Sequence, residues 1–318
     1  MKYPISFLII ICLSLTGCKS PSKERQQDAI SADYSSGKNM FQFYVFGDWG
    51  RNGEFHQKDL AELMNKATEV VEPEFIISTG DNIYPEGVAS TQDPLWKSSY
   101  EDIYSGHGLH CPWYVVLGNH DYGGNIQAEI DYSKISRRWH MPSRYYAVDQ
   151  LLDDDKTRAT FVFIDTNPLN DEYYEDDHRS KVITQDTTRQ LNWIDSVLTA
   201  SVATWKFVIG HHPLYTGGKR AGDRPFLRNH LERLFKKHKV DAYFCGHEHD
   251  LQYIKPEGPT HYFVSGSGSE VRPTGKLPFS RFAESIQGFM TISLNEKEML
   301  VQVLDYRGNL LFKTEIKK

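Results

Sequence analysis

The chain has 318 residues, of which 39% are hydrophobic and 25% charged, and its formal net charge is −6. This length accommodates one large α/β domain or two small ones, and the composition is that of a globular protein rather than a disordered or membrane-spanning one. The negative charge argues against a nucleic-acid partner, because binding to a phosphate backbone requires a basic surface.

The first 18 residues differ from the rest of the chain. Lys2 is followed by an apolar run from Ile5 to Leu15 and then by Thr16-Gly17-Cys18. A positive start, a short apolar stretch and a small-residue cleavage site are typical of a secretory signal, and the run is too short to span a bilayer as a stable helix. The four residues that end in Cys18 resemble a bacterial lipobox, in which the cysteine becomes lipidated; the alternative is an ordinary signal peptide with a chance cysteine.

These features predict how the chain is divided and where it resides. We expect residues 1–17 to be a lipoprotein signal peptide, and residues 18–39 to be a lipidated Cys18 followed by a flexible tether rich in Ser, Lys, Gln and Asp. Residues 40–318 would form a single domain. The protein would then be exported and anchored by lipid in a bacterial cell envelope, at the outer membrane, facing the periplasm or the cell surface.

Two cysteines remain in the predicted domain, Cys111 and Cys245. Each lies beside an apolar run, so we expect buried free thiols, although one disulfide between them is possible. The chain has no CxxC pair and no zinc-finger spacing.

Apolar runs alternate with helical patterns along the rest of the chain. Strands are predicted at 41–46, 75–77, 113–117, 160–164, 207–209, 242–244, 261–264 and 289–294, and helices at 55–71, 126–138, 185–200 and 225–238. A hairpin is predicted around 307–309. The alternation predicts a mixed α/β sheet, and the strand-rich end predicts a second sheet packed on the first.

Five of the predicted strands lead into a glycine followed by side chains that can bind metals. The segments are Gly47-Asp48-Trp49-Gly50, Gly80-Asp81-Asn82-Ile83-Tyr84, Gly118-Asn119-His120-Asp121, Gly210-His211-His212-Pro213 and Gly246-His247-Glu248-His249. Because ligands of open α/β sheets bind at the carboxyl ends of the strands, we expect these side chains to converge. Each segment alone has an ordinary alternative as a turn, a helix cap or a surface polar cluster. The five together predict a dinuclear metal site.

These blocks, in this order, resemble those of the purple acid phosphatases within the calcineurin-like metallophosphoesterases, from about residue 41 to about residue 305. The similarity is greatest to the small tartrate-resistant acid phosphatases, and the segment Tyr132–Trp139 also resembles that subgroup. The resemblance implies an α/β/β/α sandwich, in which two packed mixed sheets are flanked by helices, with the metals at one sheet edge.

The resemblance also implies the roles of the metal-binding residues. The first metal would be held by Asp48, Tyr84 and His249. The second metal would be held by Asn119, His211 and His247, and Asp81 would bridge the two. Many relatives outside this subgroup have a histidine two residues after the first aspartate; here that position is Gly50, so Tyr84 must supply the missing ligand. Phenolate is a hard anionic donor, which favours Fe(III) at the first site, with Fe(II), Zn(II) or Mn(II) at the second.

The implied reaction is direct attack of a metal-bound hydroxide on phosphorus, without a phospho-enzyme. Two carboxylates and a phenolate leave about two positive charges on an Fe(III)–M(II) pair, which suits binding of hydroxide and phosphate and predicts an acidic pH optimum. Asn119 and His120 would contact the phosphate, and His120 would protonate the leaving oxygen; a supporting structural role is its alternative. Lys219 or Arg220 stands where the family has a second outer-sphere histidine, and either cation could bind phosphate, but arginine cannot donate a proton near neutral pH.

Two further segments have open interpretations. His212 directly follows a predicted ligand and is expected to be structural. Residues 170–181 are acidic and polar, which fits a solvated surface loop or a mobile flap near the active site, since the subgroup has a regulatory loop in this region.

The leading hypothesis is an acid phosphatase that hydrolyses small phosphate monoesters. The alternatives are a phosphodiesterase or nucleotide hydrolase on the same metals, and a surface-binding lipoprotein without catalysis. We expect a monomer with no nucleic-acid-binding surface, in contact with a membrane only through its N-terminal lipid.

Overall fold

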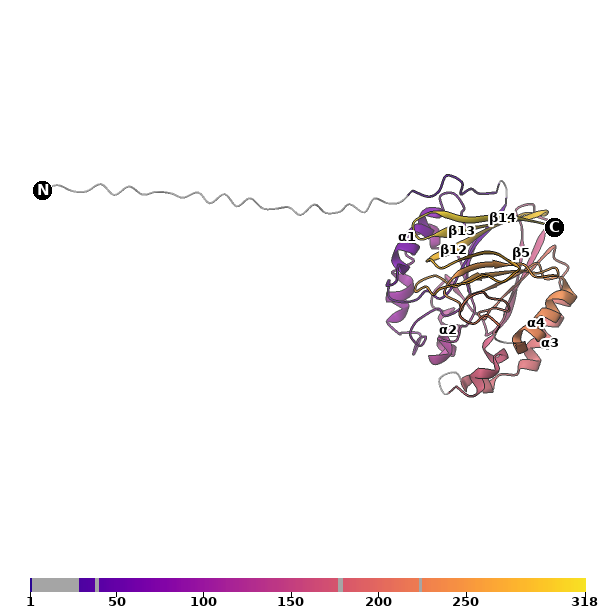
Figure 1. Cartoon of the computed structure of the whole chain (residues 1–318). Coiled ribbons are helices and arrows are strands. Elements are labelled where there is room, and N and C mark those ends of the chain that lie inside the picture. The colour runs from indigo at the N-terminus through magenta and orange to yellow at the C-terminus, as the bar shows by residue number, and fades with distance from the viewer. Residues whose placement is uncertain (2–28, 38–39, 177–179, 223–224) are drawn as a thin grey trace.

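The computed structural model of the chain describes Met1 and residues 29–37, 40–176, 180–222 and 225–318 (Figure 1). The predicted signal peptide, Cys18 and much of the predicted tether therefore lie outside the described residues. Within the described ranges, no helix is long and apolar enough to cross a membrane.

Two sheets of seven strands form the centre of the domain. The first sheet has the order β14-β13-β12-β1-β2-β3-β4 and consists of β1 (Phe41–Phe46), β2 (Phe75–Ser78), β3 (Trp113–Val115), β4 (Trp139–His140), β12 (Gly288–Leu294), β13 (Glu298–Asp305) and β14 (Leu310–Lys317). The second sheet has the order β11-β9-β10-β8-β7-β6-β5 and consists of β5 (Tyr146–Leu151), β6 (Arg158–Phe163), β7 (Trp205–Ile209), β8 (Ala242–Cys245), β9 (Leu251–Ile254), β10 (His261–Ser265) and β11 (Ser280–Glu284).

The strand-rich end of the chain does not form a sheet of its own, which corrects one expectation. β12 pairs antiparallel with β1, with Met290 opposite Val45, and β13 and β14 continue that sheet outward. β9, β10 and β11 instead extend the second sheet beside β8. Each sheet therefore combines parallel strands with antiparallel ones. In the first sheet, β12 supplies the hydrogen-bonding partner for the edge of β1 that β2 leaves unpaired.

Aromatic side chains fill the space between the two sheets. Phe43 of β1 is fully buried, and its ring centroid lies 5.3 Å from that of Phe161, 6.0 Å from that of Phe207 and 6.2 Å from that of Phe244. The three partners belong to β6, β7 and β8 of the second sheet. One residue of the first sheet thus contacts three strands of the other, so the sheets pack face to face.

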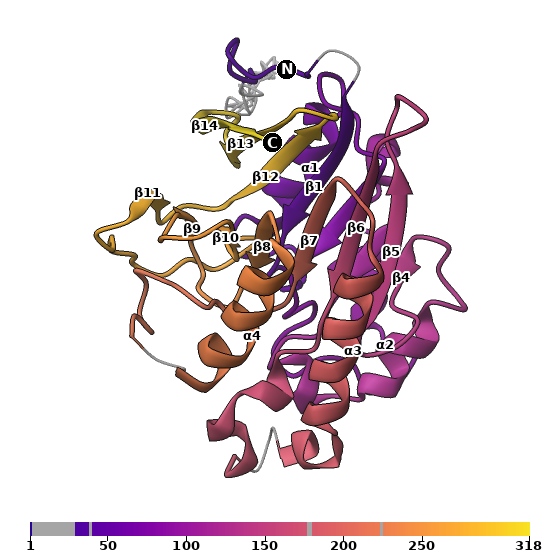
Figure 2. The ribbon, with the colours of Figure 1, turned by 90° about the vertical axis from the view of Figure 1, so that its right-hand side faces the viewer.

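Helices cover the outer faces of both sheets. They are α1 (Gln57–Ala67), α2 (Ile126–Tyr132), α3 (Thr187–Ala200) and α4 (Pro225–His238). Figure 2 shows α3 and α4 in front of the second sheet, where Leu198 and Leu231 join Val208 in one buried cluster. On the other side, Leu60 and Met64 of α1 belong to the main core. This α/β/β/α arrangement confirms the predicted fold class.

Residues 29–37, which we call the N-terminal strap, pack on the domain ahead of the predicted start at residue 40 (Figure 1). Tyr34 is only 4% exposed, Ser31 N donates to Gly308 O at 2.9 Å, and Gln302 Nε2 donates to Ser35 O at 2.8 Å. This part of the expected tether is therefore fixed to the first sheet.

The two predicted thiols are separate free cysteines; Cys245 is buried and Cys111 is partly buried.

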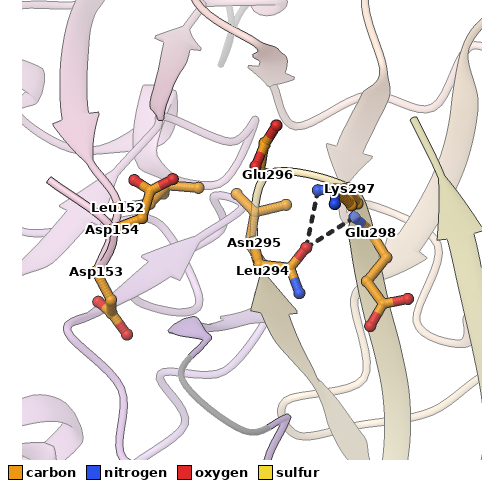
Figure 3. A pocket seen from close by; sticks show the side chains of 8 residues that line it. All are labelled: Leu152, Asp153, Asp154, Leu294, Asn295, Glu296, Lys297 and Glu298. Atoms are coloured by element: carbon orange, nitrogen blue, oxygen red, sulfur yellow. Dashed lines mark hydrogen bonds between the residues drawn. The ribbon is translucent and has the colours of Figure 1, made fainter. Parts of the chain in front are cut away.

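A pocket of about 360 Å³ lies at the end of the sheets where β1 and β6 begin (Figure 3). Asp153, Asp154, Glu296 and Glu298 contribute to its lining, and Asn295 Oδ1 accepts hydrogen bonds from the backbone nitrogens of Lys297 and Glu298 at 2.8 and 3.0 Å. The loops that carry the predicted metal ligands follow the opposite ends of these sheets and do not line this pocket.

Candidate metal centre

The predicted metal ligands lie on five loops that follow β1, β2, β3, β7 and β8. These strands are parallel within each sheet, so their carboxyl ends reach the same edge. Hydrogen bonds join the loops of the two sheets: His247 N donates to Asp48 Oδ2 at 2.9 Å, and Gly268 N donates to Gly47 O at 2.9 Å. All seven predicted ligands are buried, namely Asp48, Asp81, Tyr84, Asn119, His211, His247 and His249.

Asp48, Asp81 and His249 form a first group, with their potential ligand atoms within 4.8 Å of one another. The Tyr84 hydroxyl lies among them, 3.2 Å from Asp48 Oδ1, 3.1 Å from Asp81 Oδ2 and 3.2 Å from His249 Nε2. Three oxygens and one nitrogen therefore face a common point.

Asn119, His211 and His247 form a second group. His211 Nε2 lies 3.2 Å from Asn119 Oδ1 and 3.0 Å from His247 Nδ1. His211 Nδ1 is 2.9 Å from the carbonyl oxygen of Thr79, so Nδ1 carries the proton and donates it. This tautomer leaves the lone pair of Nε2 directed at the other two side chains, as metal-binding histidines require.

Asp81 connects the two groups. Its Oδ2 lies 3.1 Å from the Tyr84 hydroxyl and 3.4 Å from His211 Nε2, while Oδ1 accepts a hydrogen bond from His120 N at 2.8 Å. Burial opposes ionisation of Asp81, but the hydrogen bond that Oδ1 accepts from His120 N stabilises the carboxylate form. A Cβ atom on Gly118 would lie 2.1 Å from Asp81 Oδ1, so this approach requires glycine. The carboxylate is placed as a bridging ligand would be.

Three of these residues have a left-handed backbone. The φ angles are 59° at Asp48, 49° at Asp81 and 68° at His247. Such a conformation costs roughly 1–3 kcal/mol at a residue other than glycine, and it persists where the surrounding structure enforces it. Here Asp48 N donates to Gly80 O at 3.0 Å, and Trp49 N donates to Asp81 O at 3.3 Å. Strain at three converging positions is typical of a functional site.

The packing around Gly50, the position where many relatives have a histidine ligand, leaves no room for a side chain and places Tyr84 in the first group instead. A Cβ atom on Gly50 would lie 2.0 Å from Asn82 O and 2.9 Å from Ile83 Cα, so no side chain fits there. Gly50 forms a parallel bridge with Ile83, and Tyr84 N donates to Gly50 O at 2.9 Å. The same close approach positions Tyr84 in the first group.

The electrostatics of the first group fit a bound cation. Burial, and then the charge of Asp81, raises the pKa of Asp48 well above its ordinary value, and burial followed by the two carboxylates does the same to the pKa of Tyr84. Burial and the nearby Arg272 lower the pKa of His249 to about 3, which keeps its imidazole neutral. Buried anionic oxygens beside neutral imidazoles are unfavourable alone and are the donors that a metal ion binds.

His120 lies at the mouth of the site, with its side chain 28% exposed. Nδ1 is 2.5 Å from the carbonyl oxygen of Pro85 and donates to it, while Nε2 lies 4.0 Å from Asp81 Oδ2. The imidazole ring is 4.5 Å from the Tyr84 ring. His120 is thus oriented by the Pro85 carbonyl oxygen and lies beside Asp81 and Tyr84.

His212 lies within 4.8 Å of His211 and His247, but both of its ring nitrogens have other partners. Nδ1 is 2.7 Å from Thr166 Oγ1, and Nε2 is 2.7 Å from the Tyr173 hydroxyl. These contacts support the structural role expected for His212.

The loop with Lys219 and Arg220 contacts the segment that carries His247. Arg220 Nη1 is 3.3 Å from Glu248 Oε1 and 3.4 Å from His247 O, and Lys219 N donates to Glu248 Oε2 at 3.1 Å. In this arrangement the guanidinium supports the His247 loop, and phosphate binding by either cation stays a prediction.

The acidic loop predicted at 170–181 is anchored on both sides of its residues 177–179, which lie outside the described residues. Tyr173 is buried and contacts His212. Lys181 Nζ donates to the carbonyl oxygens of Tyr122 at 2.9 Å and Gly123 at 3.1 Å, and also to that of Gly124. The described part is therefore more than a solvated surface, and the flap hypothesis stays a prediction.

Sequence reasoning missed a buried carboxyl pair behind the metal loops. Asn82 Nδ2 donates to Asp121 Oδ2 at 3.1 Å and to Glu129 Oε2 at 3.2 Å, and Gly118 N donates to Asp121 Oδ2 at 2.7 Å. Burial raises the pKa of both acids, that of Glu129 to about 8. A glutamate in a helical pattern usually faces solvent, so only its burial in α2 reveals the pair.

Comparison with known proteins agrees with this geometry. Residues 41–251 match the calcineurin-like phosphoesterase family. Purple acid phosphatase 3 of Arabidopsis thaliana is 34% identical over 284 residues, covering 85% of this chain and 75% of that protein. Tartrate-resistant acid phosphatase type 5 of Oryctolagus cuniculus is 34% identical over 296 residues, covering 87% of this chain and 90% of that protein.

Two solved structures share the fold. GAP50, described as the anchor in the inner membrane complex of Plasmodium, superposes with a TM-score of 0.77 at 26% identity, covering 88% of this chain and 89% of that one. The purple acid phosphatase PPD1 of yellow lupin (Lupinus luteus) superposes with a TM-score of 0.66 at 15% identity, covering 89% of this chain and 54% of that one.

Proposed function

Since this chain belongs to the calcineurin-like phosphoesterase family and, within it, to the purple acid phosphatases, we propose that it hydrolyses small phosphate monoesters with an acidic pH optimum. The chain is a dinuclear-metal phosphatase. The observation that carries the proposal is the convergence of six buried donor side chains around a seventh, Asp81, which connects the two groups.

The donor atoms suggest how two metals are shared. Asp48, Tyr84 and His249 would hold Fe(III), because phenolate and carboxylate are hard anionic ligands. Asn119, His211 and His247 would hold Fe(II), Zn(II) or Mn(II), and Asp81 would belong to both sites. When bound, such a pair supplies a nucleophile from water and draws charge from the phosphoryl oxygens.

The chain's own residues would position the substrate and move a proton. The Asn119 amide and His120 would contact the phosphate group. His120 donates from Nδ1 to Pro85 O, so its protonated form presents Nε2–H to the leaving oxygen.

Hydrolysis of phosphate esters by residues 19–318, loaded with iron and zinc, tests this proposal, with p-nitrophenol as the product measured for the aryl esters and phosphate for alkyl esters. We expect p-nitrophenyl phosphate to be cleaved faster than its bis-ester across pH 4 to 8, with an optimum below neutral pH. In the same series, His120→Ala should lower kcat for an alkyl phosphate by about 100-fold. The loss should be smaller for p-nitrophenyl phosphate, whose leaving group departs without a proton. Preference for the diester would favour the phosphodiesterase alternative, and no turnover of either ester by the metal-loaded protein would favour a non-catalytic one.

We also propose that the protein is exported and anchored by lipid at Cys18 in a bacterial envelope. The support is the order of Lys2, an apolar run and Leu15-Thr16-Gly17-Cys18. Full-length protein expressed in a bacterium should incorporate radiolabelled palmitate and partition into detergent, and Cys18→Ser should do neither. Equal labelling of both proteins would refute the anchor.

A further inference from the structure

Arg51 lies over the ring of the proposed iron ligand Tyr84. Its guanidinium carbon is 3.6 Å from the ring centroid, the shortest cation–ring distance found in the described part of the chain. Cations are attracted to the negative face of an aromatic ring, and the attraction strengthens where water is excluded. Tyr84 is buried, so this contact is favourable.

The surrounding structure fixes Arg51 in this place. Gln57 Oε1 accepts from Arg51 N at 3.0 Å and from Gly53 N at 2.7 Å, and Gln57 Nε2 donates to Ser99 O at 2.8 Å. Arg51 Nη2 is 2.9 Å from Glu270 Oε2. The backbone and the head group are thus both held, and the guanidinium stays over the ring.

From this geometry we propose that Arg51 is a positioning residue that tunes the metal through Tyr84. A positive charge over the ring withdraws electron density from the tyrosine oxygen and makes it a weaker donor. Groups that contact a metal ligand, rather than the metal itself, are known to change the affinity and the reduction potential of the metal. The inference deepens the proposed function and rests on iron at the Tyr84 site.

The effect of Arg51 on the electrons of the Tyr84 ring and of the iron sets the direction of two measurable shifts. Moving an electron from the tyrosine ring to Fe(III) requires more energy when a cation stabilises the ring electrons, so Arg51 shifts the tyrosine–iron absorption band to shorter wavelength. A weaker donor and a nearby positive charge also favour Fe(II), so Arg51 raises the reduction potential of that iron. Both readouts are independent of turnover.

The test uses the iron-loaded protein and replaces the charge without removing the ligand. In Arg51→Gln, and in Arg51→Met as a second neutral variant that keeps the apolar stem, the band should move to longer wavelength and the potential should fall. Arg51→Lys should restore part of both shifts. Arg307→Gln is the matched control, because Arg307 lies over the Tyr306 ring at 5.0 Å outside the metal groups, and it should change neither quantity.

The outcomes separate this inference from the proposed function. If both neutral variants kept the band wavelength and the iron reduction potential of the wild type, the role of Arg51 would be overturned while the iron site stayed in place. Wild-type protein that binds iron but shows no visible band would overturn the proposed Tyr84–iron site, and the inference with it.

Discussion

Glu129 shares a buried environment with Asp121 behind the loops that carry Asp81 and Asn119. Burial raises the pKa of Glu129 from 4.5 to about 8. The folded protein therefore keeps a proton that the unfolded chain releases above about pH 4.5. For an acid with a raised pKa, this contribution to stability is fully present below the unfolded value and is lost as the pH rises through the folded one.

We expect Glu129→Gln to flatten the dependence of stability on pH between 5 and 8. The native glutamate should contribute a slope of up to about 1.4 kcal/mol per pH unit, with the free energy of unfolding falling as the pH rises. A glutamine mimics the protonated acid and does not titrate, so the variant should exceed the wild type in stability at pH 8 and match it near pH 5. Urea unfolding at constant metal content measures this.

The control for that experiment is Glu257→Gln, since Glu257 is exposed in a loop. It should follow the wild-type curve at every pH. Parallel curves for Glu129→Gln and the wild type would mean that the buried acid ionises in the folded protein.

At the scale of residues, the sequence is informative where a rule of chain geometry applies. Strand ends followed by glycine predicted that Asp48, Asp81, Asn119, His211 and His247 would converge, and the structure brings them together. Arg51 and Glu129 were not predicted, because an arginine in a loop and a glutamate in a helix carry no signal for what they face across the fold. The left-handed backbone at three site residues was equally hidden, since Asp and His also occur with ordinary φ angles.

At the scale of elements, long apolar or strongly periodic segments were predictable. The helix predicted at 225–238 has those bounds in the structure, and the strand predicted at 41–46 does also. The missed strands β4, β5, β9 and β11 are short or lie at sheet edges. The burial of β5 alternates along the strand, but its residue types do not, since Leu151 is exposed and Gln150 is partly buried. The helix predicted at 126–138 ends at Tyr132 instead, because the chain turns there to pair Trp139 with Trp113 in β3.

The assignment of strands to sheets was beyond sequence reasoning for a different reason. Pairing of β1 with β12 joins residues about 250 positions apart, and a hydrophobic pattern does not specify its partner over such a separation. The error in the predicted second sheet arose from treating strands that are consecutive in sequence as neighbours in space.

At the scale of the whole molecule, the N-terminal strap determines where the domain begins. Tyr34 is buried in the same core cluster as Tyr44, and Lys313 Nζ donates to Ser35 Oγ at 3.0 Å. A polar composition hid these contacts in the sequence, since Ile30 and Tyr34 are the only large apolar side chains of the strap. The strap is therefore part of the folded unit, although its residues resemble a linker.

A chain that begins at Met40 should be less stable than one that begins at Ala29. Loss of the strap exposes the surface beneath Tyr34, which should lower the free energy of unfolding by about 2 kcal/mol, the value of burying one large apolar side chain. Tyr34→Ala in the longer chain should reproduce much of this loss, whereas Asp33→Ala, which alters an exposed side chain, should not. Urea unfolding at one pH compares the four proteins. The strap contributes none of the seven predicted metal ligands, so phosphate release per metal-loaded molecule should be the same for both chain lengths. Equal stability would show that the strap rests on the sheet without stabilising it, and the domain would then begin at residue 40.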